Sequence, residues 1–385
     1  MKLSRESIGR RLALVGLPFF FCLPAAAQQN VRPPLHTDGH RIVDAHNRTV
    51  KLASVNWYGF DQEEFVAGGL DHQPLKEIVN KIPEMGFNSV RLPWANETFE
   101  KNPLVADYAV KANPQFRGKH AMDVMDAVIA ALAKAHLMVI LDNHMSRADW
   151  CCSEKDGNGL WANAEYSEER WLADWKAIVQ RYRNQPYVVG ADLRNELRSG
   201  AQWGGTDPAL DWHAAAERGG NAVLEANPKL LIMVEGPQYS TDFRGAAEKP
   251  VVLKIPGRLV YSPHAYASQA VKFQSYEEMK QALDARAGFL LAQDPGVPLW
   301  VGEFGTCQTL TNCGPDGTPN GQWFIWFVQY LKEKNLGWCY WPLNGNQSSG
   351  ESRKYDTVET YGLLSADYET IAAPEILRLL RTIEN

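Results

Sequence analysis

The run Trp300-Val301-Gly302-Glu303-Phe304-Gly305 is a short apolar segment that leads into a glutamate, and Asp192-Leu193-Arg194-Asn195-Glu196 has the same form. Short apolar runs bounded by turn residues are typical of strands that are buried on both faces, as in parallel sheets. A carboxylate at the end of such a strand adds nothing to the core and is costly if it is buried without a partner. We therefore expect both glutamates to serve a site rather than the packing.

Similar strand-like runs recur along the chain, separated by helical patterns such as Met122-Met125-Val128-Ile129-Leu132. The predicted strands are 53–58, 88–93, 137–142, 188–195, 230–235, 258–264, 298–303 and 337–343. Strands that alternate with helices in this way predict an α/β fold, a (β/α)8 TIM barrel. No Pro-, Ser- or Gly-rich linker divides the chain, so we expect a single domain. A short N-terminal β-hairpin is predicted from 40–44 and 49–52, which flank Asn47.

The first 27 residues have the pattern of a cleavable signal peptide. Four basic residues precede the apolar run 12–23, and Ala25-Ala26-Ala27 offers small residues for cleavage before Gln28. The apolar run is short for a membrane span, and no second one follows. We expect residues 1–27 to be removed and 28–385 to form the barrel domain. The mature protein is then expected to be secreted or periplasmic, without a membrane span.

Five cysteines remain after the signal, and an odd number leaves at least one thiol unpaired. Cys307 and Cys313 share one predicted loop and are the expected bridge. The neighbours Cys151 and Cys152 pair with each other or with nothing. Cys339 lies in a predicted strand and is expected to pack as a small apolar residue. Because the spacing of zinc-binding cysteine pairs is absent, we expect no metal and no other cofactor.

The charge and the aromatic content narrow the class of partner. The formal net charge is −6, and no basic run lies beyond the N-terminus. Nucleic acid is therefore excluded as an expected partner. All thirteen Trp lie after residue 50. Sugar rings stack on aromatic faces, so part of this set is expected to bind a glycan, and the rest to fill the core.

Polar and aromatic residues follow strand after strand where each strand ends. In a barrel these ends meet on one face, and active sites lie there. The set comprises Asn56, Trp57, Tyr58, Arg91, Asn143, His144, Asn195, Glu196, Glu235, His264, Tyr266, Glu303 and Trp341. As a set, these residues predict one site at the C-terminal face of the barrel.

Five runs carry a family resemblance, in order along nearly the whole mature chain. They are Asn88-Ser89-Val90-Arg91-Leu92-Pro93, Leu141-Asp142-Asn143-His144, Leu193-Arg194-Asn195-Glu196, His264-Ala265-Tyr266 and Gly302-Glu303-Phe304-Gly305. The chain resembles glycoside hydrolase family 5, the cellulase-like family that includes endo-β-glucanases. The resemblance implies Glu196 as acid/base and Glu303 as nucleophile. It implies supporting or substrate-binding roles for Arg91, His144, Asn195, His264, Tyr266 and Trp341, to which Trp57 is added from its place at the first strand end.

The sequence departs from the family pattern in two places. Leu197 follows the predicted acid/base where many members have proline, and the Trp150-Cys151-Cys152-Ser153 loop differs from that of common cellulases. Both departures leave the chemistry intact and bear on the substrate. The loops expected to shape the substrate site are 57–70, 145–164, 202–212 and 306–322.

Two carboxylates suit the cleavage of a glycosidic bond. Glu196 must hold a proton to donate it to the leaving oxygen, and an ionised Glu303 nearby would favour that form. Arg91 would keep Glu303 ionised, and the Tyr266 hydroxyl could orient its oxygen. Asn195 could bind the sugar 2-hydroxyl. Carboxyl groups about 5 Å apart would imply retention, and a gap of about 6.5–9.5 Å would imply inversion.

These observations predict a secreted, retaining endo-β-1,4-glucanase that acts on a β-linked polysaccharide or oligosaccharide as a monomer. A β-mannanase, a xyloglucanase and a glycolipid-directed β-glycosidase of the same family are alternatives. A non-catalytic carbohydrate-binding barrel is an alternative of a different class, although a pure binder has no need of both carboxylates. A metal-dependent barrel hydrolase is a third, for which the sequence offers no clear set of ligands.

Overall fold

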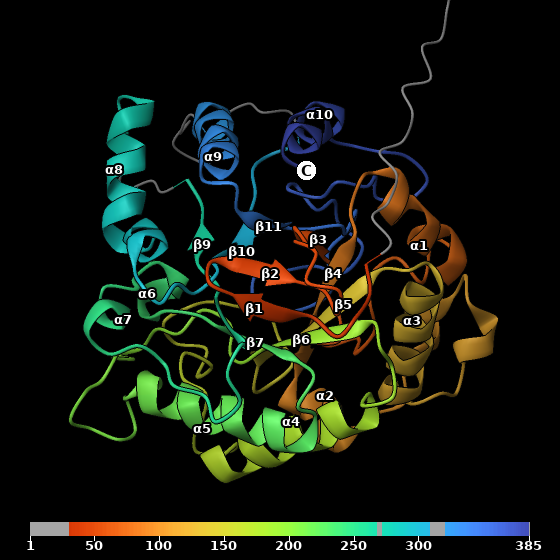
Figure 1. Cartoon of the computed structure of the whole chain (residues 1–385). Coiled ribbons are helices and arrows are strands. Elements are labelled where there is room, and N and C mark those ends of the chain that lie inside the picture. The colour runs from red at the N-terminus through yellow and green to blue at the C-terminus, as the bar shows by residue number, and fades with distance from the viewer. Residues whose placement is uncertain (1–30, 268–271, 309–319, 385) are drawn as a thin grey trace, which may run out of the picture. The chain divides into compact units, whose positions relative to one another are not determined.

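The computed structural model describes residues 31–267, 272–308 and 320–384 (Figure 1). Residue contacts divide the chain into two units, Met1–Asn30 and Val31–Asn385. The predicted signal peptide at 1–27 lies outside the described residues, as does the predicted cleavage point.

The second unit is built on a ring of parallel strands. The strands are β3 (Ala53–Asn56), β4 (Ser89–Ala95), β5 (Met138–Met145), β6 (Val188–Asp192), β7 (Leu231–Val234), β8 (Leu259–Tyr261), β9 (His264–Ala265), β10 (Trp300–Phe304) and β11 (Gly337–Tyr340). Each of the eight predicted strands overlaps one of these, and the sixth is split into β8 and β9. Four strands, β3, β6, β7 and β11, end before the predicted boundary, because their last predicted residues turn into loops, whereas β4, β5, β9 and β10 run past it.

The split sixth strand closes the ring. β8 pairs with β7 on one side, and Tyr261 at its end forms a bridge with Leu299 on the other. β9 then pairs with β10, with His264 opposite Glu303. Because β8 and β9 together occupy one strand position, between β7 and β10, the nine strands make eight positions around a barrel. The predicted (β/α)8 barrel is confirmed.

Helices surround the strands, as Figure 1 shows. The longer ones are α1 (Leu75–Glu84), α3 (Ala121–Lys134), α4 (Glu168–Arg181), α5 (Trp212–Ala226), α8 (Tyr276–Arg286) and α9 (Asn320–Lys334). The shorter ones are α2 (Asn96–Lys101), α6 (Pro237–Ser240), α7 (Gly245–Glu248) and α10 (Pro374–Leu380), with 3-10 turns at Asp107–Val110, Pro114–Phe116, Gly288–Ala292 and Arg381–Ile383. In the described part of the chain, no helix combines the length and the apolar character needed to cross a membrane.

Helix α4 shows how the sequence sets these elements. Ser167 caps its start by accepting a hydrogen bond from the Arg170 amide, and two glutamates occupy the first turn. Its buried face carries Trp171, Trp175, Ile178 and Val179 at the expected spacing. This face joins the large apolar cluster between the helices and the outside of the barrel.

A second apolar cluster fills the inside of the barrel. Its strand residues include Met138, Val189, Leu231 and Trp300, all at the starts of their strands. Ile42 of the N-terminal hairpin belongs to the same cluster. The hairpin therefore seals the N-terminal end of the barrel, which leaves the opposite end for polar groups.

The hairpin is present, but its turn was predicted in the wrong place. β1 (His36–Asp38) pairs with β2 (Arg41–Val43) across Gly39, which takes a positive φ of 56°. The predicted turn at Asn47 exists as a turn and carries only a bridge from Val43 to Thr49. The sequence signal that was passed over is the Asp-Gly pair at 38–39, a strong hairpin turn.

The cysteine predictions are resolved where the chain is described. Cys151 and Cys152 are bonded to each other. Cys339 is buried in β11 with a free thiol. Cys307 is disulfide-bonded, and its predicted partner, Cys313, lies outside the described residues.

Candidate active site

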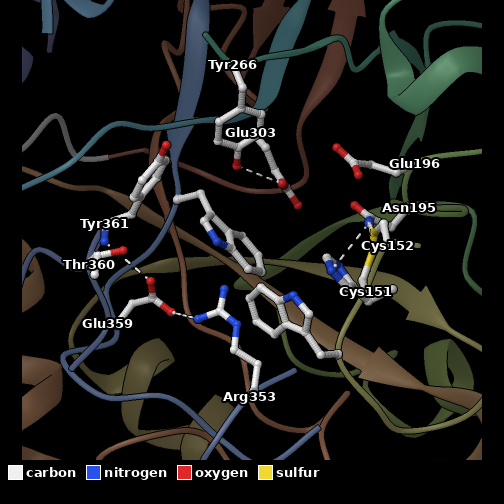
Figure 2. Close-up of a pocket in the computed structure, with 13 residues that line it drawn as sticks. Cys151, Cys152, Asn195, Glu196, Tyr266, Glu303, Arg353, Glu359, Thr360 and Tyr361 are labelled. Atoms are coloured by element: carbon white, nitrogen blue, oxygen red, sulfur yellow. Dashed lines mark hydrogen bonds and ion pairs between the residues drawn. A yellow bond between two sulfur atoms is a disulfide. The ribbon is translucent and has the colours of Figure 1, made fainter. Parts of the chain in front are cut away.

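The two predicted catalytic glutamates meet at the C-terminal face of the barrel. Glu303 is the penultimate residue of β10, and Glu196 lies four residues beyond the end of β6. One carboxylate oxygen of each, with one ring nitrogen of His264, form a group whose atoms lie within 4.8 Å of one another. Figure 2 shows the two carboxyl groups facing each other at one side of a pocket.

The pocket walls come from loops after several strands. The lining residues are His144, Trp150, Cys151, Cys152, Asn195, Glu196, Tyr266, Glu303, Trp341, Arg353, Glu359, Thr360 and Tyr361. Six of the nine predicted site residues are among them. Arg91 and His264 lie behind the lining and contact the glutamates. The pocket is therefore the place where the predicted residues converge.

Glu303 is held from two sides. Nη1 of Arg91 donates to its Oε1 at 2.7 Å, and the Tyr266 hydroxyl donates to its Oε2 at 3.0 Å. Burial and the neighbouring carboxylates of Glu303 and Glu196 raise the pKa of Tyr266 well above its usual value, so its hydroxyl keeps the proton it donates. Both contacts fix the direction in which the carboxylate oxygens of Glu303 point.

Glu196 sits on a backbone that few residues other than glycine adopt, with φ of 44°. Its amide donates to Oε2 of Glu235 at 2.8 Å, and its carbonyl accepts from Nη1 of Arg198 at 2.8 Å. These bonds hold the strained turn in place. In addition, Nδ1 of His264 lies 3.1 Å from Oε1 of Glu196, so the side chain is oriented as well.

Arg91 is the fully buried centre of the site. Its guanidinium contacts Asp142, Asp192, Glu235 and Glu303 at 2.7–3.0 Å, and it also donates to the side-chain oxygens of Asn56 and Asn195 at 3.0 and 2.9 Å. These residues come from five different strands or their loops. One cation thus ties the polar ends of the strands together.

The carboxylates around Arg91 are buried, and this changes their protonation. Burial raises the pKa of Glu235 to about 8, despite the opposing effect of His264 and Arg91. Burial likewise raises the pKa of Asp142 to about 6 and that of Asp192 above its usual value. Burial alone would lower the pKa of His264, but Glu235 and Glu303 outweigh it and raise it well above 6.5. Each of these four groups therefore keeps its proton up to a higher pH than it would in water.

His144 takes the opposite state. Burial lowers its pKa to about 4, so its ring is neutral near pH 7. Nδ1 of the ring lies 2.6 Å from Oδ2 of Asp142, and Nε2 lies 3.3 Å from Nδ2 of Asn195. Since the amide nitrogen can only donate, Nε2 accepts and Nδ1 carries the proton. His144 thereby orients the amide of Asn195 beside Glu196.

Trp341 forms an aromatic floor for the pocket. Its ring stacks on Tyr58, with centroids 5.3 Å apart, and on His144, at 5.5 Å. Trp150 packs nearby, and the Arg353 guanidinium lies over its ring at 3.4 Å from the centroid. A stacked set of this kind presents flat apolar faces toward a ligand that enters the pocket.

One predicted site residue is placed elsewhere. Trp57 is fully buried in the large core cluster, and its indole nitrogen donates to the Gly68 carbonyl at 2.9 Å. It does not line the pocket, because the chain turns after β3 and brings Tyr58 under Trp341 instead. Trp57 therefore packs in the core and does not face the pocket as expected.

Sequence reasoning missed one wall of the pocket. Arg353, Glu359, Thr360 and Tyr361 come from the long segment after β11, where no strand end marks them. Glu359 accepts from Arg353 at 2.8 Å and from the Tyr58 hydroxyl at 2.9 Å. Asp192 was also missed, because it ends the observed strand β6 but lies inside the predicted strand 188–195.

Two groups of acidic residues and histidine in the site are close enough to hold a metal ion. They are Glu196, His264 and Glu303, and Asp142, Asp192 and Glu235. In both groups the carboxylates already face a protein cation, His264 or Arg91. The negative charge of both groups is therefore balanced by cationic side chains of the protein.

Known proteins resemble this chain over most of its length. The model of the family described as Cellulase (glycosyl hydrolase family 5) matches residues 43–347. An endoglucanase of Paenibacillus polymyxa is 31% identical over 94% of this chain and 90% of its own. The major extracellular endoglucanase of Xanthomonas campestris pv. campestris is 33% identical over 90% of this chain and 70% of its own. The solved catalytic domain of the major endoglucanase from that organism superposes with a TM-score of 0.78 at 29% identity, covering 91% of this chain and 99% of the domain.

Proposed function

The chain belongs to glycosyl hydrolase family 5, the cellulase family, and we propose that it is an endo-β-1,4-glucanase that cleaves its substrate with retention through Glu196 and Glu303. The observation that carries the proposal is the pair of carboxyl groups, whose nearest oxygens lie within 4.8 Å. A retaining enzyme needs its two carboxyls about 5–5.5 Å apart, whereas an inverting one leaves about 6.5–9.5 Å for a water. The close pair supports the retaining mechanism.

In the first step, Glu303 attacks the anomeric carbon of the bound sugar and Glu196 donates its proton to the leaving oxygen. The bond to the leaving oxygen breaks, and an ester forms between the sugar and Glu303. Tyr266 and Arg91 fit this role for Glu303, because they hold both of its oxygens in place. The Nδ1 atom of His264 is close enough to keep the Glu196 carboxyl in reach of the bond.

In the second step, Glu196 takes a proton from water, and the resulting hydroxide attacks the anomeric carbon. The ester to Glu303 breaks, and the sugar leaves with its original β configuration. Asn195 is the proposed partner of the sugar 2-hydroxyl, whose hydrogen bond strengthens in the transition state. His144 keeps the Asn195 amide turned toward the pocket.

The proposed substrate is a soluble β-1,4-glucan chain. Trp341 offers a flat face for the sugar at the cleavage point, and the same pocket is flanked by Trp150 and Tyr361. The relatives named as endoglucanases support a glucan over a mannan or a xyloglucan. We further propose that residues 28–385 form the catalytic domain, that 1–27 are a signal peptide, and that the enzyme acts outside the cytoplasm as a monomer.

A reducing-sugar assay on soluble β-1,4-glucan, glucomannan, mannan and xyloglucan tests the proposal. The wild type should release sugar fastest from the β-1,4-glucan, and Glu196→Ala should lose that release. Glu225→Ala is the matched control, because Glu225 is an exposed helix residue that forms a surface ion pair with Lys176. Faster release from mannan or xyloglucan would show that this polymer, and not β-1,4-glucan, is the preferred substrate. Glycan binding without release from any polymer would favour a non-catalytic binding barrel.

A further inference from the structure

The Cys151–Cys152 disulfide lines the pocket beside Glu196 and takes no part in the steps above (Figure 2). Both cysteines are half-buried, so the pocket reaches them. Their two sulfur atoms and one Glu196 carboxylate oxygen lie within 4.8 Å of one another. The Asn195 amide donates to both sulfurs, at 3.6 and 3.7 Å. The disulfide is thus a wall of the site at the proposed proton donor.

Stability does not account for this disulfide. A disulfide constrains the unfolded chain more when it closes a longer loop, and this one joins adjacent residues. The surrounding loop is held by other means. Nε of Arg198 donates to the Ser153 carbonyl at 3.0 Å, its Nη1 donates to the Glu196 carbonyl, and the buried guanidinium also pairs with Asp156. One guanidinium therefore keeps the loop next to Glu196 whether or not the sulfurs are joined.

The chemistry of the bonded pair suits a sugar contact. Two joined sulfurs have no hydrogen to donate and accept hydrogen bonds only weakly, so they present a polarizable, nearly apolar surface. The ring of a β-linked glucose unit has apolar C–H faces, and burying apolar surface is favourable. Two free thiols would occupy more space, because they cannot approach each other as closely, and would present S–H donors to the same sugar.

The position of the disulfide selects which sugar it contacts. Glu196, as proton donor, must lie beside the oxygen that joins the departing sugar to the rest. Glu303 bonds to the sugar on the opposite side of the cleaved bond. It lies in a cluster with Glu196 and His264, whereas the two sulfurs cluster with Glu196. We propose that the Cys151–Cys152 disulfide determines specificity by packing against the sugar unit on the leaving-group side of the cleaved bond. This inference rests on the proposed function, which assigns the proton donor.

The test compares the double variant Cys151→Ala, Cys152→Ala with the wild type on two substrates. Cellotetraose places a sugar on the leaving-group side, whereas β-cellobiosyl fluoride releases only fluoride. We expect kcat/KM for cellotetraose to fall about 10-fold, the scale of losing one apolar contact with a substrate. The value for the fluoride should stay within about twofold of wild type. Thermal unfolding checks that both proteins are folded.

Chemical reduction gives a second measurement that needs no substitution. Treating the wild type with a phosphine reductant should reproduce the loss on cellotetraose alone. The treated double variant is the control, because it keeps the disulfide of Cys307 and lacks only this one. Equal losses on both substrates would overturn the inference, since the disulfide would then act through Asn195, and so would no loss on either. A wild type that cleaves neither substrate would instead refute the proposed function.

Discussion

Arg91 and Glu303 form an ion pair of 2.7 Å between side chains that are 212 residues apart in the chain. The Arg91 side chain is fully buried, and the Glu303 side chain is only 6% exposed. Arg91 leaves β4 and Glu303 leaves β10, and the barrel brings the ends of both strands to one point. A buried pair of this kind needs its geometry to be held by further hydrogen bonds, and Asn56, Asn195 and Tyr266 supply them.

Glu303→Gln should abolish turnover while leaving binding intact. The amide has the same shape and can still accept from Tyr266, but it cannot attack the anomeric carbon. We expect kcat on cellotetraose to fall at least about 1,000-fold, with binding retained in titration calorimetry. Turnover near the wild-type rate would remove Glu303 from the role of nucleophile.

The configuration of the first product separates the two mechanisms. Because the two carboxyls are close, we expect the β anomer to appear first when cellotetraose hydrolysis is followed by proton NMR. The α anomer should then grow only at the rate of spontaneous mutarotation. If the α anomer appears first, the enzyme is inverting and Glu303 activates water instead.

Tyr266→Phe should slow the reaction more than it weakens binding. The lost hydroxyl donates to the Glu303 carboxylate, and a hydrogen bond to a charged group contributes about 1.5–3 kcal/mol. We expect kcat to fall about 10- to 100-fold, with KM changed less than about threefold. Equal kcat with a raised KM would show that Tyr266 binds sugar rather than orienting Glu303.

Arg91→Met should destabilise the fold severely at neutral pH. The change leaves Asp142, Asp192, Glu235 and Glu303 buried without their shared cation, and breaking a buried pair costs about 3–5 kcal/mol. Urea unfolding should show this loss.

Arg244→Ala is the control for Arg91→Met. Arg244 pairs with Asp242 and its side chain is 68% exposed, and an exposed pair contributes about 0–1 kcal/mol. Similar unfolding midpoints for the two variants would contradict the central role of Arg91.

The contribution of Glu235 to the stability of the enzyme should fall as the pH rises from about 4.5 to about 8. The pKa of Glu235 is raised from 4.5 to about 8 by burial, so in this window the folded state binds a proton that the unfolded state has lost. Stability therefore falls with increasing pH. The raised pKa of His264 acts in the same direction above pH 6.5, because the folded state again holds more protons.

Glu235→Gln tests this origin of the pH dependence. Glutamine has no proton to lose, so the variant should show a flatter free energy of unfolding between pH 4.5 and 8, measured by urea titration at several pH values. The amide oxygen can still accept from the Glu196 amide or from Arg91, as the Glu235 carboxylate does. An unchanged slope would mean that Glu235 does not carry the shift.

Some of the site was open to prediction because it follows from local pattern. Glu303 and Arg91 stand in or directly after apolar runs that are typical of buried strands, and parallel strands bring their ends to one face. Asn195 and Glu196 follow the same rule after β6. The rule does not say which residue after a strand faces the pocket. After β3 it is Tyr58 that stacks on Trp341, while Trp57 lies in the core.

The chain pattern by itself determined the barrel and indicated which two glutamates follow buried strands. Alternation of buried runs with amphipathic helices leaves few other folds, and a charged residue at a buried strand end has few other uses. The hairpin was expected, but its turn lies at Gly39 rather than at Asn47, and the local Asp-Gly pair at 38–39 was the signal that would have placed it.

Only the tertiary structure decided how the site is finished. Four carboxylates share the guanidinium of Arg91, and the Cys151–Cys152 disulfide contacts Asn195. The ring of His144 is neutral because it is buried. Each of these features depends on segments that are far apart in the chain. Arg353 and Glu359 reach the pocket on a segment without regular strands. Protonation and contact depend on burial and on distances of a few ångström, and no spacing along the chain encodes these before the barrel has closed.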